Sequence, residues 1–397
     1  MRGRWARLGS AATAVLLLAA SGCGAGELPA RTAAAQSWRR LAASPLAPRI
    51  GHSAVWTGAD LLIWGGGPFG VRPLADGAAY DPAADRWRRL PPAPLAGRTW
   101  HAAVWTGTEM LVWGGTRPAP GGRPETALAD GAAYRPATRT WRPIAPAPVA
   151  GDTAVWSGRE LLVFGRPGRG GSRPDRAAPR PDVAGSRLEG AAWDPRTGRW
   201  RRLPASPLPA GDQAEVVLAG DVVAAFTYLD SERACHGGLY DLAAGTWRTL
   251  DACPLLPIMY PQPVWTGAEL VLLTTGPEWF DGGDNDWGER VYANGIYDPA
   301  GGSWRRPAAR PAGLQPGYGV RFVWTGREVL LWGRGGGAAY DPAADRWRRM
   351  ADAPFTREFA SSAWTGAELL IWGGATGDDC GDGCPRADGL AYRPGTG

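Results

Sequence analysis

The segment AVWTGADLLIWGG (54–66) decides the fold, because it returns at intervals along the whole chain. Six further segments follow the same pattern, one of them in degenerate form: AVWTGTEMLVWGG (103–115), AVWSGRELLVFGR (154–166), VVLAGDVVAAFTY (216–228), PVWTGAELVLLTT (263–275), FVWTGREVLLWGR (322–334) and SAWTGAELLIWGG (362–374). Self-similarity at a spacing of this order is typical of solenoids and propellers. The sequence therefore predicts seven repeats, which we number in chain order.

A second element follows each copy. In GAAYDPAADRW (77–87) six residues separate a Tyr from a Trp, and the spacing recurs, once with Trp193 for the Tyr, in GAAYRPATRTW (131–141), GAAWDPRTGRW (190–200), GGLYDLAAGTW (237–247), NGIYDPAGGSW (294–304) and GAAYDPAADRW (337–347). The seventh copy, GLAYRPGTG (389–397), ends before its Trp. The segment SWRRL (37–41) at the other end of the chain matches the missing piece.

Each repeat divides into four short strands, which we call a to d. Strand a (SAVW) turns at Thr-Gly into strand b (LLIWGG), a loop leads to strand c (GAAY), and DPAADR turns into strand d (WRRL). Such turn residues between apolar runs favour hairpins. Because one four-stranded unit cannot bury both faces, we predict an all-β, seven-bladed propeller in which residues 37–41 complete the last blade.

The Gly-Gly pair after strand b and the Tyr-x6-Trp spacing resemble the kelch-type β-propellers, the group to which galactose oxidase belongs, over residues 37–393. The resemblance implies the propeller fold and a propeller domain at 37–397. It does not fix a function, because kelch propellers include binding proteins and enzymes. The copper site of galactose oxidase, which needs two His, two Tyr and a Tyr–Cys crosslink, does not match this chain residue by residue.

The N-terminus has the pattern of a bacterial export signal. Three Arg precede the apolar run AATAVLLLAA (11–20), which is too short to span a bilayer, and ASGC (20–23) resembles a lipoprotein cleavage site. We expect a signal peptide at 1–22, lipidation of Cys23, a tether at 23–36 and a membrane-anchored protein at the cell surface. Cleavage and secretion without lipidation is the alternative.

Charge argues against nucleic acid as a partner. The chain has no Lys, and removal of residues 1–22 lowers its formal charge from +5 to +2, because that segment carries three Arg and no acid. The remaining Arg residues are interspersed with acids rather than gathered in one stripe.

Four further cysteines suggest disulfides in an exported protein. Cys235 and Cys253 lie nearly opposite each other across the predicted c–d hairpin of repeat 4, and Cys380 and Cys384 bracket a tight loop in repeat 7. We expect the pairs 235–253 and 380–384. A metal site built on these cysteines lacks a nearby His.

Residues that recur in every repeat are most simply structural. They include the Trp of strands a and d, the acid after the Thr-Gly turn and the Arg-Arg pair of strand d; we expect the acids and Arg pairs to be solvated edges and turn partners. Function is sought instead where the pattern breaks. The b–c and d–a connections vary, and strand alternation places them on one face of the ring.

Three b–c loops of this face stand out. The loop at 373–387 carries Asp378, Asp379 and Asp382, which we expect to be exposed. The loop at 167–189 is expected to be a flap. The loop at 276–290 carries Trp279, which could contact a partner, and four acids whose oxygens suit Ca²⁺: Asp281, Asp284, Asp286 and Glu289. A solvated loop without ligand is the alternative.

The entries into strand a lie at the predicted mouth of the central channel. Candidate ligand-binding residues there are Arg49, His52, Arg98, Trp100, His101, Tyr260, Tyr318, Arg321, Arg357 and Glu358. Arg side chains among aromatic rings are suited to a carboxylated or sugar-like ligand.

These features favour a monomeric binding module for a protein or a carbohydrate-like ligand. The alternative is an extracellular hydrolase, lyase or oxidase acting on a carbohydrate-like substrate, with Glu358 or Asp212 as a candidate acid or base. A purely structural envelope role is the third possibility.

Overall fold

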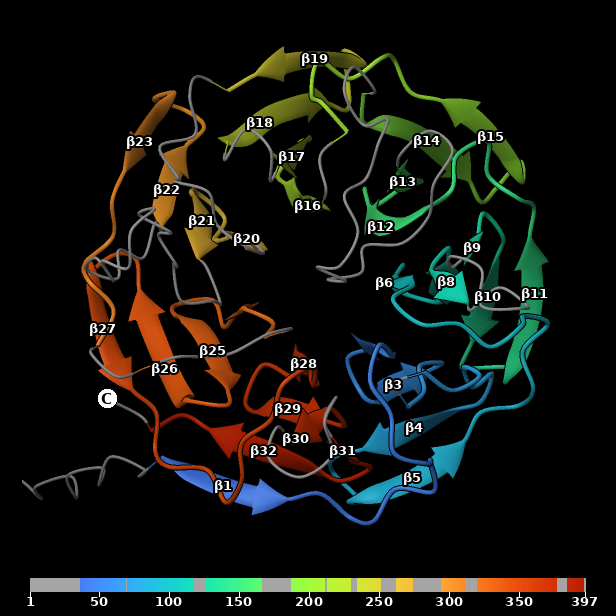
Figure 1. The fold of residues 1–397 in the computed structure, drawn as a ribbon, viewed down its shortest axis with the longest axis vertical. Coiled ribbons are helices and arrows are strands. Elements are labelled where there is room, and N and C mark those ends of the chain that lie inside the picture. Colours follow the sequence, from blue (N-terminus) through green and yellow to red (C-terminus); the bar gives the residue numbers. More distant parts are fainter. Residues whose placement is uncertain are drawn as a thin grey trace, which may run out of the picture.

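The computed structural model describes residues 36–68, 70–117, 126–165, 187–210, 213–229, 234–250, 262–273, 294–311, 314, 320–376 and 384–395. Within these residues there is no helix, and seven four-stranded antiparallel sheets stand radially around a central axis (Figure 1). The chain is thus an all-β, seven-bladed propeller, as the repeats predict.

Blades 1 to 6 follow one another in sequence, and each runs from an inner strand at the axis to an outer strand at the rim. The inner strands, equivalent to strand a, are β2 (Ser53–Trp56), β6 (Ala102–Trp105), β12 (Gly151–Trp156), β16 (Gln213–Ala219), β20 (Gln262–Trp265), β24 (Val323–Trp324) and β28 (Ser361–Trp364). The b strands are β3 (Leu61–Trp64), β7 (Met110–Trp113), β13 (Leu161–Gly165), β17 (Val222–Leu229), β21 (Leu270–Leu273), β25 (Val329–Gly333) and β29 (Leu369–Trp372).

The two outer layers complete each blade. The c strands are β4 (Gly77–Asp81), β10 (Gly131–Arg135), β14 (Glu189–Asp194), β18 (Ala234–Asp241), β22 (Gly295–Asp298), β26 (Gly336–Asp341) and β32 (Gly389–Arg393). The d strands are β5 (Arg86–Arg89), β11 (Thr140–Ile144), β15 (Arg199–Arg202), β19 (Thr246–Thr249), β23 (Ser303–Arg305), β27 (Arg346–Arg349) and β1 (Ser37–Arg40). Two small hairpins are added by β8 (Thr116–Arg117) with β9 (Thr126–Ala127) and by β30 (Ala375–Thr376) with β31 (Cys384–Pro385).

The ring closes through the N-terminal strand, as predicted. Strand β1 pairs antiparallel with β32, with Trp38 opposite Tyr392, so the first and last described strands lie side by side in blade 7 (Figure 1). The Trp38 indole also donates to the carbonyl oxygen of Ala351 in blade 6. This closure removes the open edge that the last blade would otherwise present.

Seven apolar clusters hold neighbouring blades together, one at each blade interface. Between blades 1 and 2, for example, the fully buried Trp64 and Leu62 of β3 pack against Val112 of β7 and Tyr134 of β10. Six of the seven b strands are buried along their whole length, and β17 is buried from Val223 to Tyr228, because these strands lie between two sheets on both faces.

The recurring acids pair with the first Arg of strand d in their own blade, and that Arg can reach the next blade, whereas the second Arg of the pair is exposed as expected in β1, β5 and β27. Arg39 of β1 binds Glu368 of its own blade at 2.7 Å and donates to the hydroxyl of Tyr80 in blade 1 at 3.0 Å. The Glu368 side chain is only 12% exposed. The expectation that these acids are solvated was wrong, because each lies beneath the Arg side chain that neutralises it; equivalent pairs are Arg88–Asp60, Arg142–Glu109, Arg201–Glu160, Arg305–Glu269 and Arg348–Glu328.

Candidate binding site in the central channel

The inner strands surround a cavity of about 430 Å³ at the centre of the ring. Residues from all seven blades line it, and they come from the start of each inner strand and the d–a connection before it. The cavity therefore lies on the variable-loop side, where the sequence predicted a site. Its volume falls in the range of small-ligand pockets.

One position of the repeat differs from blade to blade in this cavity. Three residues before the Trp of strand a, or before Leu218 in blade 4, the seven blades carry Ser53, Ala102, Thr153, Glu215, Gln262, Arg321 and Ser361. Six of the seven side chains are polar, although strand b close behind is apolar and nearly invariant. We call this set the channel ring.

Four members of the channel ring bind the next blade. Ser53 Oγ lies 2.9 Å from His101 Nε2 of blade 2. The other three donate to backbone carbonyl oxygens of the following blade: Thr153 to Ala214 at 3.2 Å, Gln262 to Val320 at 2.5 Å and Ser361 to His52 at 3.1 Å. These hydrogen bonds connect neighbouring inner strands and leave Glu215 and Arg321 as the charged members of the ring.

Glu215 and Arg321 face each other across blade 5. The closest nitrogen and oxygen atoms are 4.0 Å apart, and the side chains are 28% and 57% exposed. Burial in the channel raises the pKa of Glu215; Arg321 opposes this shift and the nearby Asp152 carboxylate adds to it. The ion pair is thus too long for a hydrogen bond and compensates the Glu215 charge only in part.

Aromatic rings cover the opposite arc of the channel. Trp100 and Phe359 meet edge to face with their ring centroids 5.8 Å apart, although they belong to blades 2 and 7. The equivalent residue of blade 1 is Gly51, whose Cβ, if present, would lie 3.2 Å from the Trp100 ring. Trp100 and Phe359 both have φ near +56°, a left-handed conformation that bulky residues rarely adopt. Such strain is concentrated at functional sites and costs of order 1–3 kcal/mol per residue.

His52 and His101 occupy equivalent positions beside the aromatic arc. Each ring stacks edge to face on the last Trp of the neighbouring b strand, Trp372 and Trp64 respectively. Burial, together with nearby Arg49 and Arg98, lowers both pKa values to about 3, so both imidazoles are neutral at physiological pH. In blade 3 the same position is Asp152.

Three of the candidate arginines are buried clamps. Arg49, Arg98 and Arg357 are at most 5% exposed, and each joins its d–a connection to the b–c loop of its own blade. Arg98, for example, donates to the carbonyl oxygen of Gly114 at 3.0 Å and to the Asp130 carboxylate at 2.9 Å. The matching carboxylates are Asp76 for Arg49 and Asp388 for Arg357.

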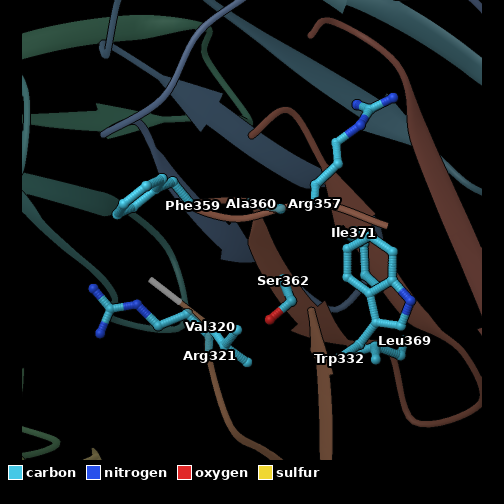
Figure 2. A pocket seen from close by; sticks show the side chains of 9 residues that line it. All are labelled: Val320, Arg321, Trp332, Arg357, Phe359, Ala360, Ser362, Leu369 and Ile371. Atoms are coloured by element: carbon cyan, nitrogen blue, oxygen red, sulfur yellow. The ribbon is translucent and has the colours of Figure 1, made fainter. Parts of the chain in front are cut away.

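Figure 2 shows that the Arg321 side chain points in a different direction from the buried side chain of Arg357. The side chains of Arg321 and Phe359 extend to the same side, away from Trp332, whereas Arg357 points in the opposite direction. The cavity drawn there, between blades 6 and 7, measures only about 10 Å³ and has room for about one water molecule. It is too small for an organic ligand, so the central cavity is the candidate site.

The remaining predicted site residues are placed as follows. Glu358 lies at the edge of blade 7, where its backbone pairs with Ala375. Outside the described residues lie Tyr260, Tyr318, Trp279 and the four acids proposed for Ca²⁺, Asp281, Asp284, Asp286 and Glu289. The described residues contain no group of three or more His, Cys, Asp or Glu that could hold a metal ion.

The cysteine pairings remain predictions. Cys235 lies on β18 opposite Tyr228, and Tyr240 pairs with Trp247 across the hairpin as the spacing predicts. Cys253, its expected partner, lies outside the described residues. Cys384, on β31, takes part in a disulfide, and its expected partner Cys380 also lies outside them.

Comparison with protein-family models and with curated proteins gives no match for this chain. In the described part of the chain, no helix has the length and apolar character needed to cross a membrane.

Sequence reasoning missed Glu215 and Asp152 as channel residues. Glu215 directly precedes the degenerate fourth copy, in which Leu218 replaces the Trp of strand a, and Asp152 occupies the place of a repeated His. Alignment of the seven copies with one another would have revealed Glu215, because its position at the start of strand a is polar and changes from blade to blade, whereas strand b of the same repeat is apolar and nearly invariant.

Proposed function

We propose that this chain is an exported kelch-type propeller that binds a small carbohydrate-like ligand in its central channel. The observation that carries the proposal is the 430 Å³ cavity, whose lining departs from the repeat at the channel ring and the aromatic arc. Structural positions repeat from blade to blade, whereas Glu215, Arg321, Trp100 and Phe359 occur once each at their positions.

The chemistry of the lining supports a sugar-like ligand. Aromatic rings at the mouth offer flat apolar faces to the C–H side of a sugar ring, and the polar groups of the channel ring offer donors and acceptors to its hydroxyls. The backbone at this position has positive φ in blades 1, 2 and 7, and blade 1 carries Gly51 there. Bulky aromatic residues at a position that favours glycine cost stability, which supports a role of Trp100 and Phe359 in binding.

Thermal unfolding tests this proposal. The purified protein is screened against neutral, acidic and amino sugars, and a ligand at about 100 times its Kd adds about 2.7 kcal/mol to the free energy of unfolding. We expect a stabilising sugar whose effect disappears in Phe359→Ala. The control is Trp200→Ala, which removes an aromatic side chain from the outer strand β15. No shift with any sugar, or a shift that survives Phe359→Ala, contradicts channel binding.

A second candidate function is hydrolysis or elimination on a carbohydrate-like substrate, with Glu215 as general acid. The position of Glu215 in the cavity favours it, as does its pKa, which burial raises, because a carboxyl group with a raised pKa holds a transferable proton nearer to neutral pH. New reducing ends or unsaturated products formed by the wild type and absent with Glu215→Gln would identify this activity.

Export and anchoring are part of the proposal. The support is the sequence of residues 1–23, with its basic start, short apolar run and Cys23. Labelling of growing bacterial cells with a palmitate analogue is expected to mark the wild type and not Cys23→Ala. Equal labelling of both proteins would rule out Cys23 as the anchor, and absence of label from both would favour secretion.

A further inference from the structure

Most of the charge near the channel mouth is matched inside the protein. The three buried Arg clamps are neutralised within their own blades by Asp76, Asp130 and Asp388. Both buried imidazoles are neutral, because burial lowers their pKa values to about 3. Asp152 lines the cavity but is engaged by other groups of the protein, among them the Thr153 hydroxyl, which donates to it at 3.2 Å. The described lining of the cavity therefore offers a ligand one pair of charged side chains, Glu215 and Arg321.

Glu215 and Arg321 are too far apart to hydrogen-bond each other and close enough to bind neighbouring atoms of one ligand. Their closest nitrogen and oxygen atoms are 4.0 Å apart, and both side chains are partly exposed to the cavity. A carboxylate accepts hydrogen bonds and a guanidinium group donates them, whereas a hydroxyl group does both. Two adjacent hydroxyls of a sugar can thus donate to Glu215 and accept from Arg321 at the same time.

The opposite charges of the pair favour a ligand without net charge. An ammonium group attracted by Glu215 is repelled by Arg321, and a carboxylate attracted by Arg321 is repelled by Glu215. Adjacent hydroxyls form charge-assisted hydrogen bonds with both side chains and are repelled by neither. This ligand differs from the carboxylated one expected from the sequence, because three of the four Arg residues behind that expectation are buried clamps.

Gln262 of blade 5 holds Arg321 in this place. In the other six blades the channel-ring residue is paired with strand b. Arg321 instead lies two residues before β24 begins and outside the ladder described for blade 6. The buried amide group of Gln262 binds the backbone on both sides of Arg321, donating to the carbonyl oxygen of Val320 at 2.5 Å and accepting from the N–H of Phe322 at 3.3 Å. The neighbouring blade therefore positions Arg321, rather than its own sheet.

The aromatic arc lies across the channel from the charged pair. Trp100 and Phe359 belong to blades 2 and 7, on either side of blade 1, whereas Glu215 and Arg321 belong to blades 4 and 6, on either side of blade 5 (Figure 1). A sugar that binds the pair through its hydroxyls still has apolar C–H groups, which the aromatic rings are suited to cover.

We infer that Glu215 and Arg321 bind two adjacent hydroxyl groups of a neutral sugar, and that Gln262 is the residue that positions Arg321 for this contact. The inference rests on the proposed function and narrows its ligand class to neutral sugars with a vicinal diol.

Deoxy sugars test the contact. Titration calorimetry at neutral pH is carried out on the folded protein with the methyl glycosides of D-glucose, D-galactose and D-mannose, in which C1 carries no free hydroxyl. The tightest binder is compared with its 3-deoxy analogue, which has no two adjacent hydroxyls, and with its 6-deoxy analogue, which keeps the adjacent hydroxyls of the ring. We expect the 3-deoxy sugar to bind about tenfold more weakly than the parent, equivalent to about 1.4 kcal/mol, and the 6-deoxy sugar to bind within about twofold of it.

Four variants assign the contact to these residues. Glu215→Gln and Arg321→Gln are each expected to bring the affinities for the parent and the 3-deoxy sugar close to equality. Gln262→Leu is expected to do the same, because Arg321 loses the group that positions it. Glu189→Gln, which changes a carboxylate at the start of β14 next to Arg202, is expected to leave the difference unchanged. All affinities are measured well below the unfolding temperature of each variant, so a loss of stability alone does not alter the comparison.

The other outcomes separate the inference from the proposed function. Equal binding of the parent and the 3-deoxy sugar, or tighter binding of the corresponding 2-amino sugar or uronate, overturns the diol inference and leaves sugar binding in place. A difference that survives Glu215→Gln or Arg321→Gln also overturns it, and one that survives Gln262→Leu overturns the positioning role. Absence of binding by all three parent glycosides counts against the inference and the proposed function together.

Discussion

Acidification between pH 7.5 and 5.0 is expected to destabilise the fold through His52 and His101. Both imidazoles are buried, and both pKa values are lowered from 6.5 to about 3. In this pH range the unfolded chain takes up a proton at each His and the folded chain does not. Each folded pKa is lowered, so the stability present above pH 6.5 is lost as the pH falls toward 3. At pH 5.0 the loss is about 2 kcal/mol per His, because each unit of pH below the unfolded pKa contributes about 1.4 kcal/mol.

Urea unfolding followed by tryptophan fluorescence at the two pH values measures this loss. Glu215, whose pKa is raised by burial, acts in the opposite direction, because the folded state then takes up its proton first. Its effect cancels when the pH dependence of the wild type is compared with that of a His variant. We expect His101→Gln to reduce the loss by about 2 kcal/mol and the double variant with His52→Gln to reduce it by about 4 kcal/mol. Identical pH dependence in all three proteins would refute the assignment of buried, neutral imidazoles.

Three further predictions concern the scaffold and use thermal or urea unfolding. Deletion of residues 36–40 removes β1 and its pairing with β32, and is expected to lower Tm by more than about 8 °C, since several hydrogen bonds and a packed Trp are lost; an unchanged Tm would contradict the ring closure. Arg98→Ala is expected to cost about 1–3 kcal/mol, because it leaves the buried carbonyl oxygen of Gly114 without its donor, whereas the Asp130 carboxylate is 43% exposed and is solvated in the variant; an unchanged free energy of unfolding would mean that water replaces the guanidinium group. Gly65→Ala is expected to cost at least about 2 kcal/mol more than Gly58→Ala, because both have positive φ but only at Gly65 would the new Cβ lie 2.6 Å from the His101 ring; equal costs would show that the ring moves aside.

Most of the fold could be predicted from the sequence, because the repeat carries its own register. The Tyr-x6-Trp spacing places Tyr240 opposite Trp247, as observed, and the unpaired segment at 37–41 predicts its place beside β32. The sequence repeat predicts the strands and their register because each copy packs in the same way between two neighbouring blades.

The site was harder to predict because its partners come from different blades. The sequence position of Arg98 suggests a ligand-binding residue at the channel mouth. In the structure Arg98 is instead bound to Asp130, 32 residues further along the chain. Trp100 of blade 2 and Phe359 of blade 7 are in contact because blade 1, between them, carries only Gly51 at the same position. Glu215 of blade 4 and Arg321 of blade 6 likewise come from blades on either side of blade 5. Strand order predicts which blades are neighbours, but not which side chains turn toward the axis.

The closure of the ring has a consequence for biosynthesis. Arg40 pairs with Leu390, so β1 is synthesised about 350 residues before its partner strand β32. At about 5–20 residues per second, the intervening chain takes roughly 20–70 seconds to synthesise. Throughout that interval the partially synthesised chain presents an unpaired β1 and an incomplete ring, both open to pairing with other chains. Blade 7 therefore cannot close before residues 389–393 have been synthesised, and until then β1 is an unpaired strand.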